Sequence, residues 1–204
     1  LNSQNFLLLI VSYVFYGWWD WRFLFLLILL SLANYFFGIE IESNNKSRGK
    51  IWLIIGLIIN ISVLGFFKYY NFFIDGFIDL ISLIGYDLPI STTKIILPLG
   101  ISFYVFISLS YIIDIYKKNL NANRNIIEVL LALSFFPIIL AGPIQRPASL
   151  LPQINKIREF DYNQAVDGLR QILWGLFAKV IIADNLAFQV DNIFSNVTKY
   201  SGSL

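Results

Sequence analysis

The chain has 204 residues, of which 57% are hydrophobic and 14% charged, with a formal net charge of +2 and no His, Cys or Met. Soluble domains contain about 45–50% apolar and about 25% charged residues, so this composition favours a membrane protein. The missing His and Cys exclude imidazole or thiolate catalysis, zinc sites built on these ligands, and disulfides from this chain. The small net charge gives no support for a nucleic-acid partner. Because Met is absent, we expect an interior segment of a longer protein.

Six apolar segments approach the about 20 residues that a helix needs to cross a bilayer. They cover residues 6–19, 23–39, 52–67, 95–116, 126–142 and 165–190. The first two are so close that we expect a tight hairpin, with Trp18, Trp19 and Trp21 at the level of the lipid headgroups. We therefore predict an all-α integral membrane protein, a single module over residues 1–204 that forms a multi-span helical bundle.

A different pattern follows the third segment, over residues 71–84. Asn71, Asp75 and Asp79 recur every four residues, and apolar side chains fill the rest. This spacing predicts an interfacial helix with one polar face toward water. An ordinary short span is less favoured, because it would place two carboxylates in hydrocarbon.

The basic residues of the short connectors predict the orientation in the membrane. Connectors 40–50 and 117–125 each contain three basic residues, whereas the connector between them is acidic, with three Asp residues. The basic residues are Lys46, Arg48, Lys50, Lys117, Lys118 and Arg124. We therefore expect loops 40–50 and 117–125 to be cytoplasmic in a multi-pass protein of the cytoplasmic (inner) membrane.

The fifth segment, 126–142, does not read as a plain span. It contains Glu128 and Pro137 and ends at Gly142-Pro143, and a proline removes a backbone hydrogen bond and kinks a helix. The loop after it is basic, which contradicts a crossing at this point. Broken backbone is tolerated within a membrane only where protein or a watery cavity surrounds it. We predict a re-entrant or broken element and a first candidate for a functional site.

Two donor-rich side chains, Gln145 and Arg146, follow this break. A guanidinium offers five donors in a planar fork and could hold a phosphate, a thioester carbonyl or a sugar hydroxyl. From the residues alone, a basic anchor at anionic headgroups explains Arg146 better.

Lys179 lies inside the apolar run 172–183. An ionisable residue within a span is a functional candidate, but a snorkelling lysine or one paired with a distant carboxylate explains it as well. Asp184, five residues on, does not share its α-helical face and is a poor predicted partner. The spacings of Asp167–Arg170 and Asp114–Lys118 predict local ion pairs.

Several sequence strings together resemble the membrane-bound O-acyltransferase family, most closely its alginate O-acetyltransferase branch. They are Ser12-Tyr-Val-Phe-Tyr-Gly-Trp-Trp-Asp20, Phe67-Lys-Tyr-Tyr-Asn-Phe72, Leu97-Pro-Leu-Gly-Ile-Ser-Phe-Tyr104, Ser110-Tyr-Ile-Ile-Asp-Ile-Tyr116, Ala141-Gly-Pro-Ile-Gln-Arg146 and Lys179-Val-Ile-Ile-Ala-Asp-Asn-Leu186. The resemblance covers residues 5–190 and only the N-terminal part of the family's domain, without its first span.

The resemblance implies an enzyme that O-acetylates an extracytoplasmic polysaccharide such as alginate. Its acyl donor, acetyl-CoA or an acyl carrier, is a substrate, and no bound cofactor or metal is expected. Its partners are the lipid bilayer, the polysaccharide acceptor and other envelope proteins of polysaccharide modification. The family's catalytic histidine lies in a later part, so we expect no catalytic residue here and no activity of this chain alone. The expected chamber residues are Gly142, Pro143, Gln145, Arg146 and Lys179.

Two other function classes remain open from the sequence. A transporter or channel subunit could also use broken helices and Lys179, but no pair of matching interrupted segments indicates an inverted repeat. A membrane scaffold without enzymatic activity fits the composition equally well.

Overall fold

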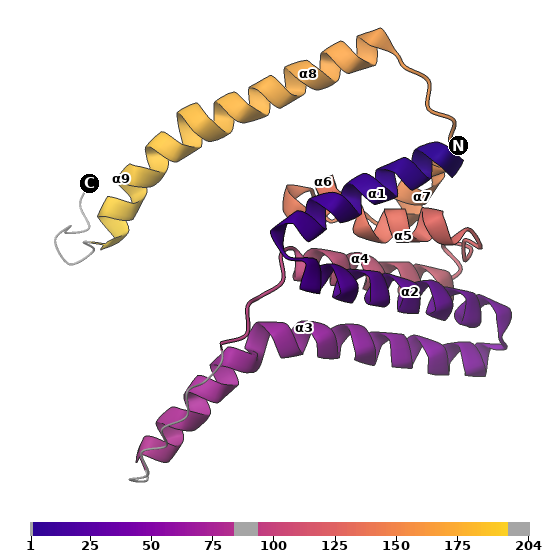
Figure 1. The fold of residues 1–204 in the computed structure, drawn as a ribbon, viewed down its shortest axis with the longest axis horizontal. Helices are drawn as coiled ribbons and strands as arrows, with labels where there is room; N and C mark the ends of the chain where they lie inside the picture. The colour runs from indigo at the N-terminus through magenta and orange to yellow at the C-terminus, as the bar shows by residue number, and fades with distance from the viewer. Residues whose placement is uncertain (1, 84–93, 196–204) are drawn as a thin grey trace. The chain divides into compact units, whose positions relative to one another are not determined.

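Helices form all the regular structure of the described chain. The protein is represented by a computed structural model, which describes residues 2–83 and 94–195. The elements are α1 (Asn2–Trp19), α2 (Trp21–Ser43), α3 (Lys46–Leu83), α4 (Ile101–Tyr116), α5 (Ile126–Ser134), α6 (Phe136–Ala141), α7 (Pro147–Ile154), α8 (Tyr162–Leu176), the π-helix η1 (Phe177–Ala183) and α9 (Asp184–Ser195). Within these residues no strand forms, which confirms the predicted all-α fold (Figure 1).

The chain divides into two compact units, Leu1–Ile157 and Arg158–Leu204, and each is described by itself. The first holds α1 to α7, and the second holds α8, η1 and α9. Three helical stretches are long and apolar enough to cross a bilayer, namely Trp21–Ser43, Lys46–Ile78 and Tyr162–Ser195. The chain is therefore a multi-pass membrane protein, while its organisation as one functional module stays a prediction.

The predicted hairpin of the first two segments is present, and Asp20 alone joins α1 to α2. The Asp20 carboxylate caps α2 by accepting the Arg22 backbone N–H at 2.9 Å, and it pairs with the Arg22 guanidinium at 2.7 Å. Hydrogen bonding from that guanidinium lowers the pKa of Asp20. Three indoles surround this turn, and Trp18 and Trp21 are 90% and 66% exposed, as expected for side chains that face headgroups.

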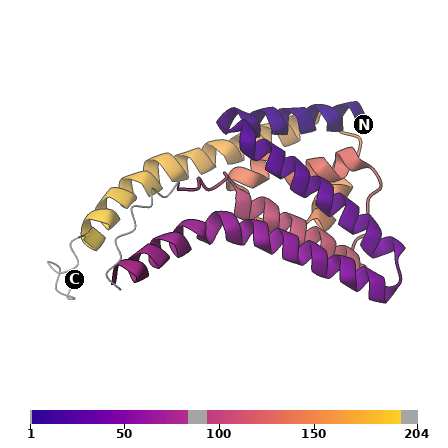
Figure 2. The same cartoon turned by 60° about the horizontal axis from the view of Figure 1, so that its bottom comes forward.

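The third predicted span and the predicted interfacial helix form one continuous helix, α3, rather than two elements. Figure 2 shows that α3 bends along its length. Asn71 ties this helix to the chain before α4, because its amide donates to the Ile95 carbonyl at 2.8 Å and its side-chain oxygen accepts the Ile95 N–H at 2.9 Å. Helicity through Leu83 agrees with the sequence pattern, whereas Ile84 and Asp87 lie outside the described residues.

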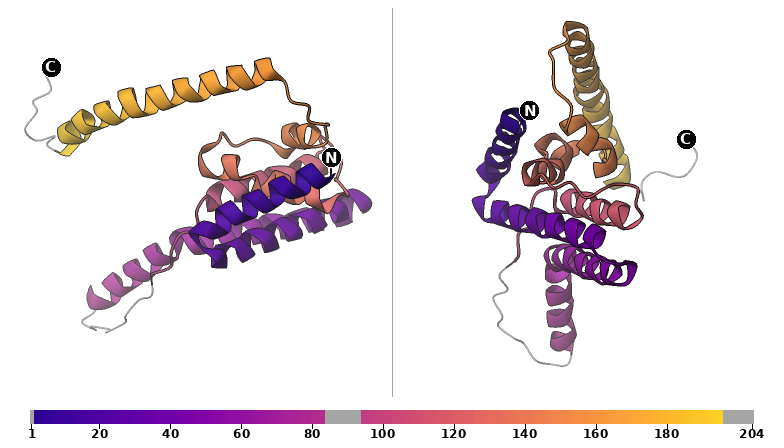
Figure 3. Two further views of the ribbon diagram at one scale, coloured as in Figure 1. Left: turned by 45° about the horizontal axis from the view of Figure 1, so that its top comes forward. Right: turned by 90° about the vertical axis from the view of Figure 1, so that its right-hand side faces the viewer.

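Helices α2, α3 and α4 lie side by side and form much of the core (Figure 3). Tyr104, Ser108 and Tyr111 share one face of α4 and are fully buried, so this face packs between helices. Asn34 of α2 and Asn60 of α3 exchange amide hydrogen bonds of 3.2 and 2.9 Å inside this core. Satisfied pairing of this kind removes the cost of burying two amides.

The fourth predicted span begins six residues too early, because α4 starts at Ile101 and not at 95. Gly100 caps it in the left-handed conformation, with φ of 65°. A Cβ at Gly100 would lie 2.5 Å from the Ile139 carbonyl oxygen of α6. Glycine is therefore required here both by the backbone conformation and by the close approach of α6.

The element predicted to be broken, 126–142, consists of two helices that meet at Phe135. Pro137 stands in the first turn of α6, where its missing N–H costs no helical hydrogen bond. Ser12 of α1 accepts the freed Phe136 N–H at 3.4 Å. The broken backbone is thus enclosed by protein, which is the condition for such a break in a membrane.

After this break the chain returns through α7 to the end of the bundle that it left. The residues before α5 and those at the end of α7 line one cavity of about 450 Å³. Its lining residues are Leu120, Asn121, Ala122, Asn123, Arg124, Leu151, Pro152 and Asn155. Glu128 fits this geometry, because its carboxylate accepts the amides of Asn123 and Asn125 at 2.6 and 2.8 Å at that same end. Segment 126–154 is therefore re-entrant with respect to the bundle.

Single cysteines at Asn121 and Asn155 are expected to react with a membrane-impermeant maleimide from the same side of the membrane, because both line this cavity. These 204 residues contain no Cys, so within them each variant reports one position. Cysteine at Arg22, at the opposite end of the α2 span, is the control and should react from the other side. Labelling of 121 and 155 from opposite sides would contradict the re-entrant geometry.

Candidate functional site

The candidate site is the extended connection 142–146 between α6 and α7. Gly142 ends α6 with φ of −75° and ψ of 161°, and Arg146 precedes α7 with φ of −76° and ψ of 135°. Both are extended conformations. Pro147 opens α7 at a position where a proline is favoured. The connection is therefore a short non-helical segment between the end of α6 and the start of α7.

A Cβ at Gly142 would lie 2.8 Å from the Ile138 Cα, so the chain leaves α6 in close contact with its own last turn. Pro143 follows in the exposed part of the connection. Gly142 and Pro143 thus set the direction in which the chain leaves α6, and Gln145 and Arg146 follow them.

The side chains of Gln145 and Arg146 make no hydrogen bond or ion pair with the described residues 2–83 and 94–195. Gln145 is half-buried and Arg146 is exposed. The Arg146 backbone is nevertheless fixed, because its carbonyl accepts the Ser149 hydroxyl at 2.8 Å and the Ser149 N–H at 2.9 Å. The site therefore offers a guanidinium and an amide on a positioned backbone, with their donors free for a ligand.

Arg146 lies at the other end of α7 from Asn155. The eight residues of α7, about 12 Å of helix, separate it from Asn155, which shares a cavity with the 117–125 connector. A headgroup anchor belongs at the bundle end, where the lipid phosphates are. A charged side chain within the hydrocarbon is costly unless it has a partner or a polar cavity, so ligand binding and headgroup anchoring are the two roles to test for the exposed Arg146.

Beside α6, an apolar groove of about 660 Å³ runs along α1. It is lined by Ile10, Val11, Val14, Phe15, Trp18, Trp19, Leu99 and Leu140. Leu140 lies two residues before Gly142, so the groove borders the start of the candidate site. Its lining is hydrocarbon and indole, without a carboxylate or amine.

Lys179 belongs to the second unit, and its predicted lack of a local partner is wrong. Lys179 Nζ lies 2.7 Å from Asp184 Oδ2. The reason is the π-helix η1, in which hydrogen bonds run from residue i to i+5, as from the Asp184 N–H to the Lys179 carbonyl. Residues five apart then share a face, which an α-helical spacing does not allow.

The other predicted ion pairs have different outcomes. Arg170 and Asp167 pair at 3.1 Å, as predicted. The expected Asp114–Lys118 pair is absent among the described contacts, and Asp114 instead accepts the Asn119 amide at 3.5 Å. Lys118 has left the helix with φ of 62°, so its side chain does not follow the i, i+4 direction.

A metal centre is not assembled in the described part of the chain, where no three Asp or Glu side chains come together as ligands. Unit 1 does bring Gly142, Pro143, Gln145 and Arg146 together in one connection, whereas Lys179 lies in the other unit. Sequence spacing could not reveal the Lys179–Asp184 pair, since only the helix type decides it.

The chain matches known proteins over nearly its whole length. It is 40% identical over 194 residues to a probable alginate O-acetylase of Pseudomonas aeruginosa and 38% identical to that of Pseudomonas syringae pv. tomato, each match covering 94% of this chain and 37% of the relative. It is 34% identical to a peptidoglycan O-acetyltransferase of Helicobacter pylori, with 95% of this chain and 41% of the relative covered.

No family model and no solved structure matches the chain. The chain spans less than half the length of these curated relatives. Their similarity covers nearly all of its described residues, including the broken element and the candidate site. The chain is thus homologous to part of the alginate O-acetylases and of a peptidoglycan O-acetyltransferase, the branch that its sequence strings resemble.

Proposed function

We propose that this chain forms part of a membrane O-acyltransferase that O-acetylates an extracytoplasmic, alginate-like polysaccharide. The relatives it matches are named for alginate and for peptidoglycan O-acetylation. The protein would lie in the cytoplasmic membrane with loops 40–50 and 117–125 on the cytoplasmic side. Its substrates would be acetyl-CoA or an acyl carrier and the polysaccharide, with other envelope proteins of polysaccharide modification as partners.

The observation that carries this proposal is the pair of free donors in the connection between α6 and α7. Gln145 and Arg146 follow the helix break at which Ser12 accepts the Phe136 N–H. The Arg146 carbonyl is held by the hydroxyl of Ser149. Preorganised donors are what an acyl-transfer site needs, because negative charge develops on the carbonyl oxygen when it is attacked.

In the proposed reaction, the acceptor hydroxyl oxygen bonds to the acyl carbon while the bond to the donor breaks, and the hydroxyl proton passes to a base. This chain contains no His, and the family resemblance implies a catalytic histidine in a later part, so that base would come from the rest of the enzyme. The Arg146 guanidinium would donate to the acyl carbonyl or to a sugar hydroxyl, with Gln145 as a second donor.

Lys179, in the second unit, would contribute a separate basic group. Its pairing with Asp184 holds the ammonium on one face of η1, and π-helical turns are frequent at functional sites. With Asp184 as counter-ion, the pair carries no net charge, so Lys179 would orient a polar group rather than attract an anion.

Replacing Arg146 by Ala in the full-length enzyme is expected to lower polysaccharide acetylation about 10–100-fold, the effect of losing one charge-assisted hydrogen bond to the transition state. Membrane expression should hold, because the Arg146 side chain has no partner among the described residues. Arg48→Ala, an exposed arginine at the start of α3, is the control. The chain of 204 residues alone is expected to be inactive and serves as the blank. Full activity of Arg146→Ala would return Arg146 to the role of headgroup anchor.

A further inference from the structure

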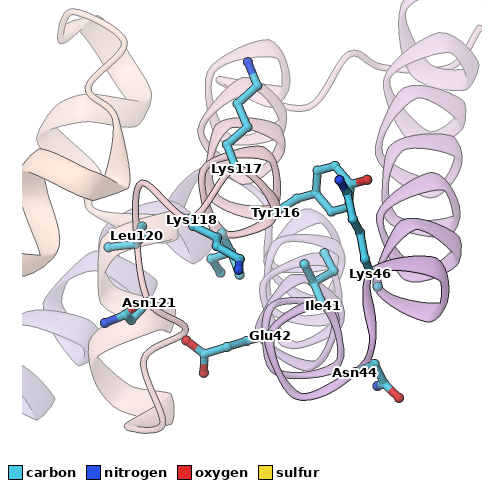
Figure 4. Close-up of a pocket in the computed structure, with 11 residues that line it drawn as sticks. Ile41, Glu42, Asn44, Lys46, Tyr116, Lys117, Lys118, Leu120 and Asn121 are labelled. Carbon is cyan, nitrogen blue, oxygen red and sulfur yellow. The ribbon is translucent and has the colours of Figure 1, made fainter.

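A basic cavity of about 540 Å³ lies where the turn between α2 and α3 meets the end of α4. Figure 4 shows Lys46 approaching from the start of α3 and Lys118 from the end of α4. Lys117 is the third lysine of the lining, and Figure 4 shows its side chain pointing away from Lys118. The buried Ile41 and Ile115 supply the apolar part of the lining. The cavity therefore combines cationic walls with a hydrocarbon base.

The positive charge of this cavity is not neutralised by the protein. In the part of the chain that the structure describes, Lys46, Lys117 and Lys118 make no ion pair. The carboxylate of the lining, Glu42, is already engaged, since it accepts the Ala122 N–H at 2.9 Å and lies 3.7 Å from the Arg124 guanidinium. The three lysines of the lining make the local charge positive, which favours the binding of an anion.

The walls of the cavity are held in place before any ligand binds. At the end of α4, the Asn119 N–H donates to the Asp114 carbonyl and the Lys118 N–H to the Ile115 carbonyl, both at 2.9 Å. These are the two hydrogen bonds of a Schellman motif, with Lys118 at its left-handed position. Beyond it, the Tyr35 hydroxyl donates to the Arg124 carbonyl at 2.9 Å, which ties the connector to α2.

The cavity lies at the boundary of the membrane-spanning part. One candidate span ends at Ser43 and the next begins at Lys46, so the turn between them stands where hydrocarbon gives way to headgroups and water. A lysine at this level attracts the phosphates of anionic lipids. We propose that this cavity binds a phosphate group, supplied either by the headgroup of an anionic phospholipid or by a soluble phosphorylated molecule.

The test titrates the purified full-length protein in neutral detergent with short-chain phosphatidylglycerol and, separately, with inorganic phosphate. Replacing the three cavity lysines by Gln is expected to weaken binding at least about tenfold. The matched control, Arg48→Gln, Lys50→Gln and Lys156→Gln, removes the same charge from residues outside the lining and should leave binding within about twofold. Lys118→Gly alone keeps the left-handed turn and should give an intermediate loss even if the triple variant folds poorly.

Binding of phosphatidylglycerol without binding of inorganic phosphate at millimolar concentration supports a lipid headgroup, and binding of both supports a soluble phosphorylated ligand. Absence of binding for both probes overturns the proposal. Equal weakening in the cavity variant and the control overturns it as well, because the attraction would then be a property of total charge.

Discussion

Replacing Gly100 by Ala is expected to destabilise the membrane bundle by about 2–4 kcal/mol. Gly100 has φ of 65°, and an added Cβ would lie 2.4 Å from Ile139 Cγ2 and 2.5 Å from the Ile139 carbonyl oxygen. A side chain could turn aside, but the carbonyl belongs to the backbone of α6 and cannot move without the helix. The measurement is the midpoint of thermal unfolding of the purified protein in detergent.

Gly65→Ala provides the matched control for this substitution. Gly65 lies within α3, and nothing lies within 4 Å of its ideal Cβ, so Ala should be neutral or stabilising by up to about 1 kcal/mol through its helix propensity. Because α6 leads directly to Gly142, Gly100→Ala should also reduce the acetylation that we propose for the full-length protein. Equal unfolding midpoints for the two variants would contradict the close approach of α4 and α6.

Replacing Asn34 by Leu is expected to cost about 1–3 kcal/mol, because it leaves the Asn60 amide buried without its cross-helix partner. The two amides lie 26 residues apart in the sequence and join α2 to α3. Each also donates to a carbonyl of its own helix, to Leu30 and to Gly56 at 2.8 Å. The pair therefore satisfies most of its hydrogen-bonding capacity inside the core.

The double variant Asn34→Leu/Asn60→Leu should be more stable than the sum of the two single effects predicts. It removes both amides together, and two Leu side chains of similar size fit an apolar interface. A coupling of about 0.6–2 kcal/mol is expected for a hydrogen bond between membrane helices, measured by unfolding of all four variants in detergent. Strictly additive single effects would show that the two amides do not stabilise each other.

The break within segment 126–142 was predictable from local chemistry. Pro137 has no backbone N–H to donate within a helix, and Gly142-Pro143 favours the end of a helix. These residues alone therefore predict a broken element. The sequence could not reveal that Ser12, 124 residues away from Phe136, would accept the freed N–H. The sequence also did not indicate that α3 is one continuous helix. Polar residues at helical spacing fit a separate helix over 71–84 as well as a continuation of the span before it.

Composition and apolar segments by themselves determined that this is an all-helical, multi-pass membrane protein, because a backbone in lipid must satisfy its hydrogen bonds within helices. The order of short strings along the chain indicated the acetyltransferase relatives. Only the structure decided the partner of Lys179, through the helix type of η1, and the lysines that line the basic cavity, which come from α3 and the end of α4. Those outcomes depend on the i to i+5 bonding of η1 and on the left-handed turn at Lys118. Both are backbone conformations that neighbouring residues alone do not specify, so the direction of each lysine follows from the fold rather than from sequence spacing.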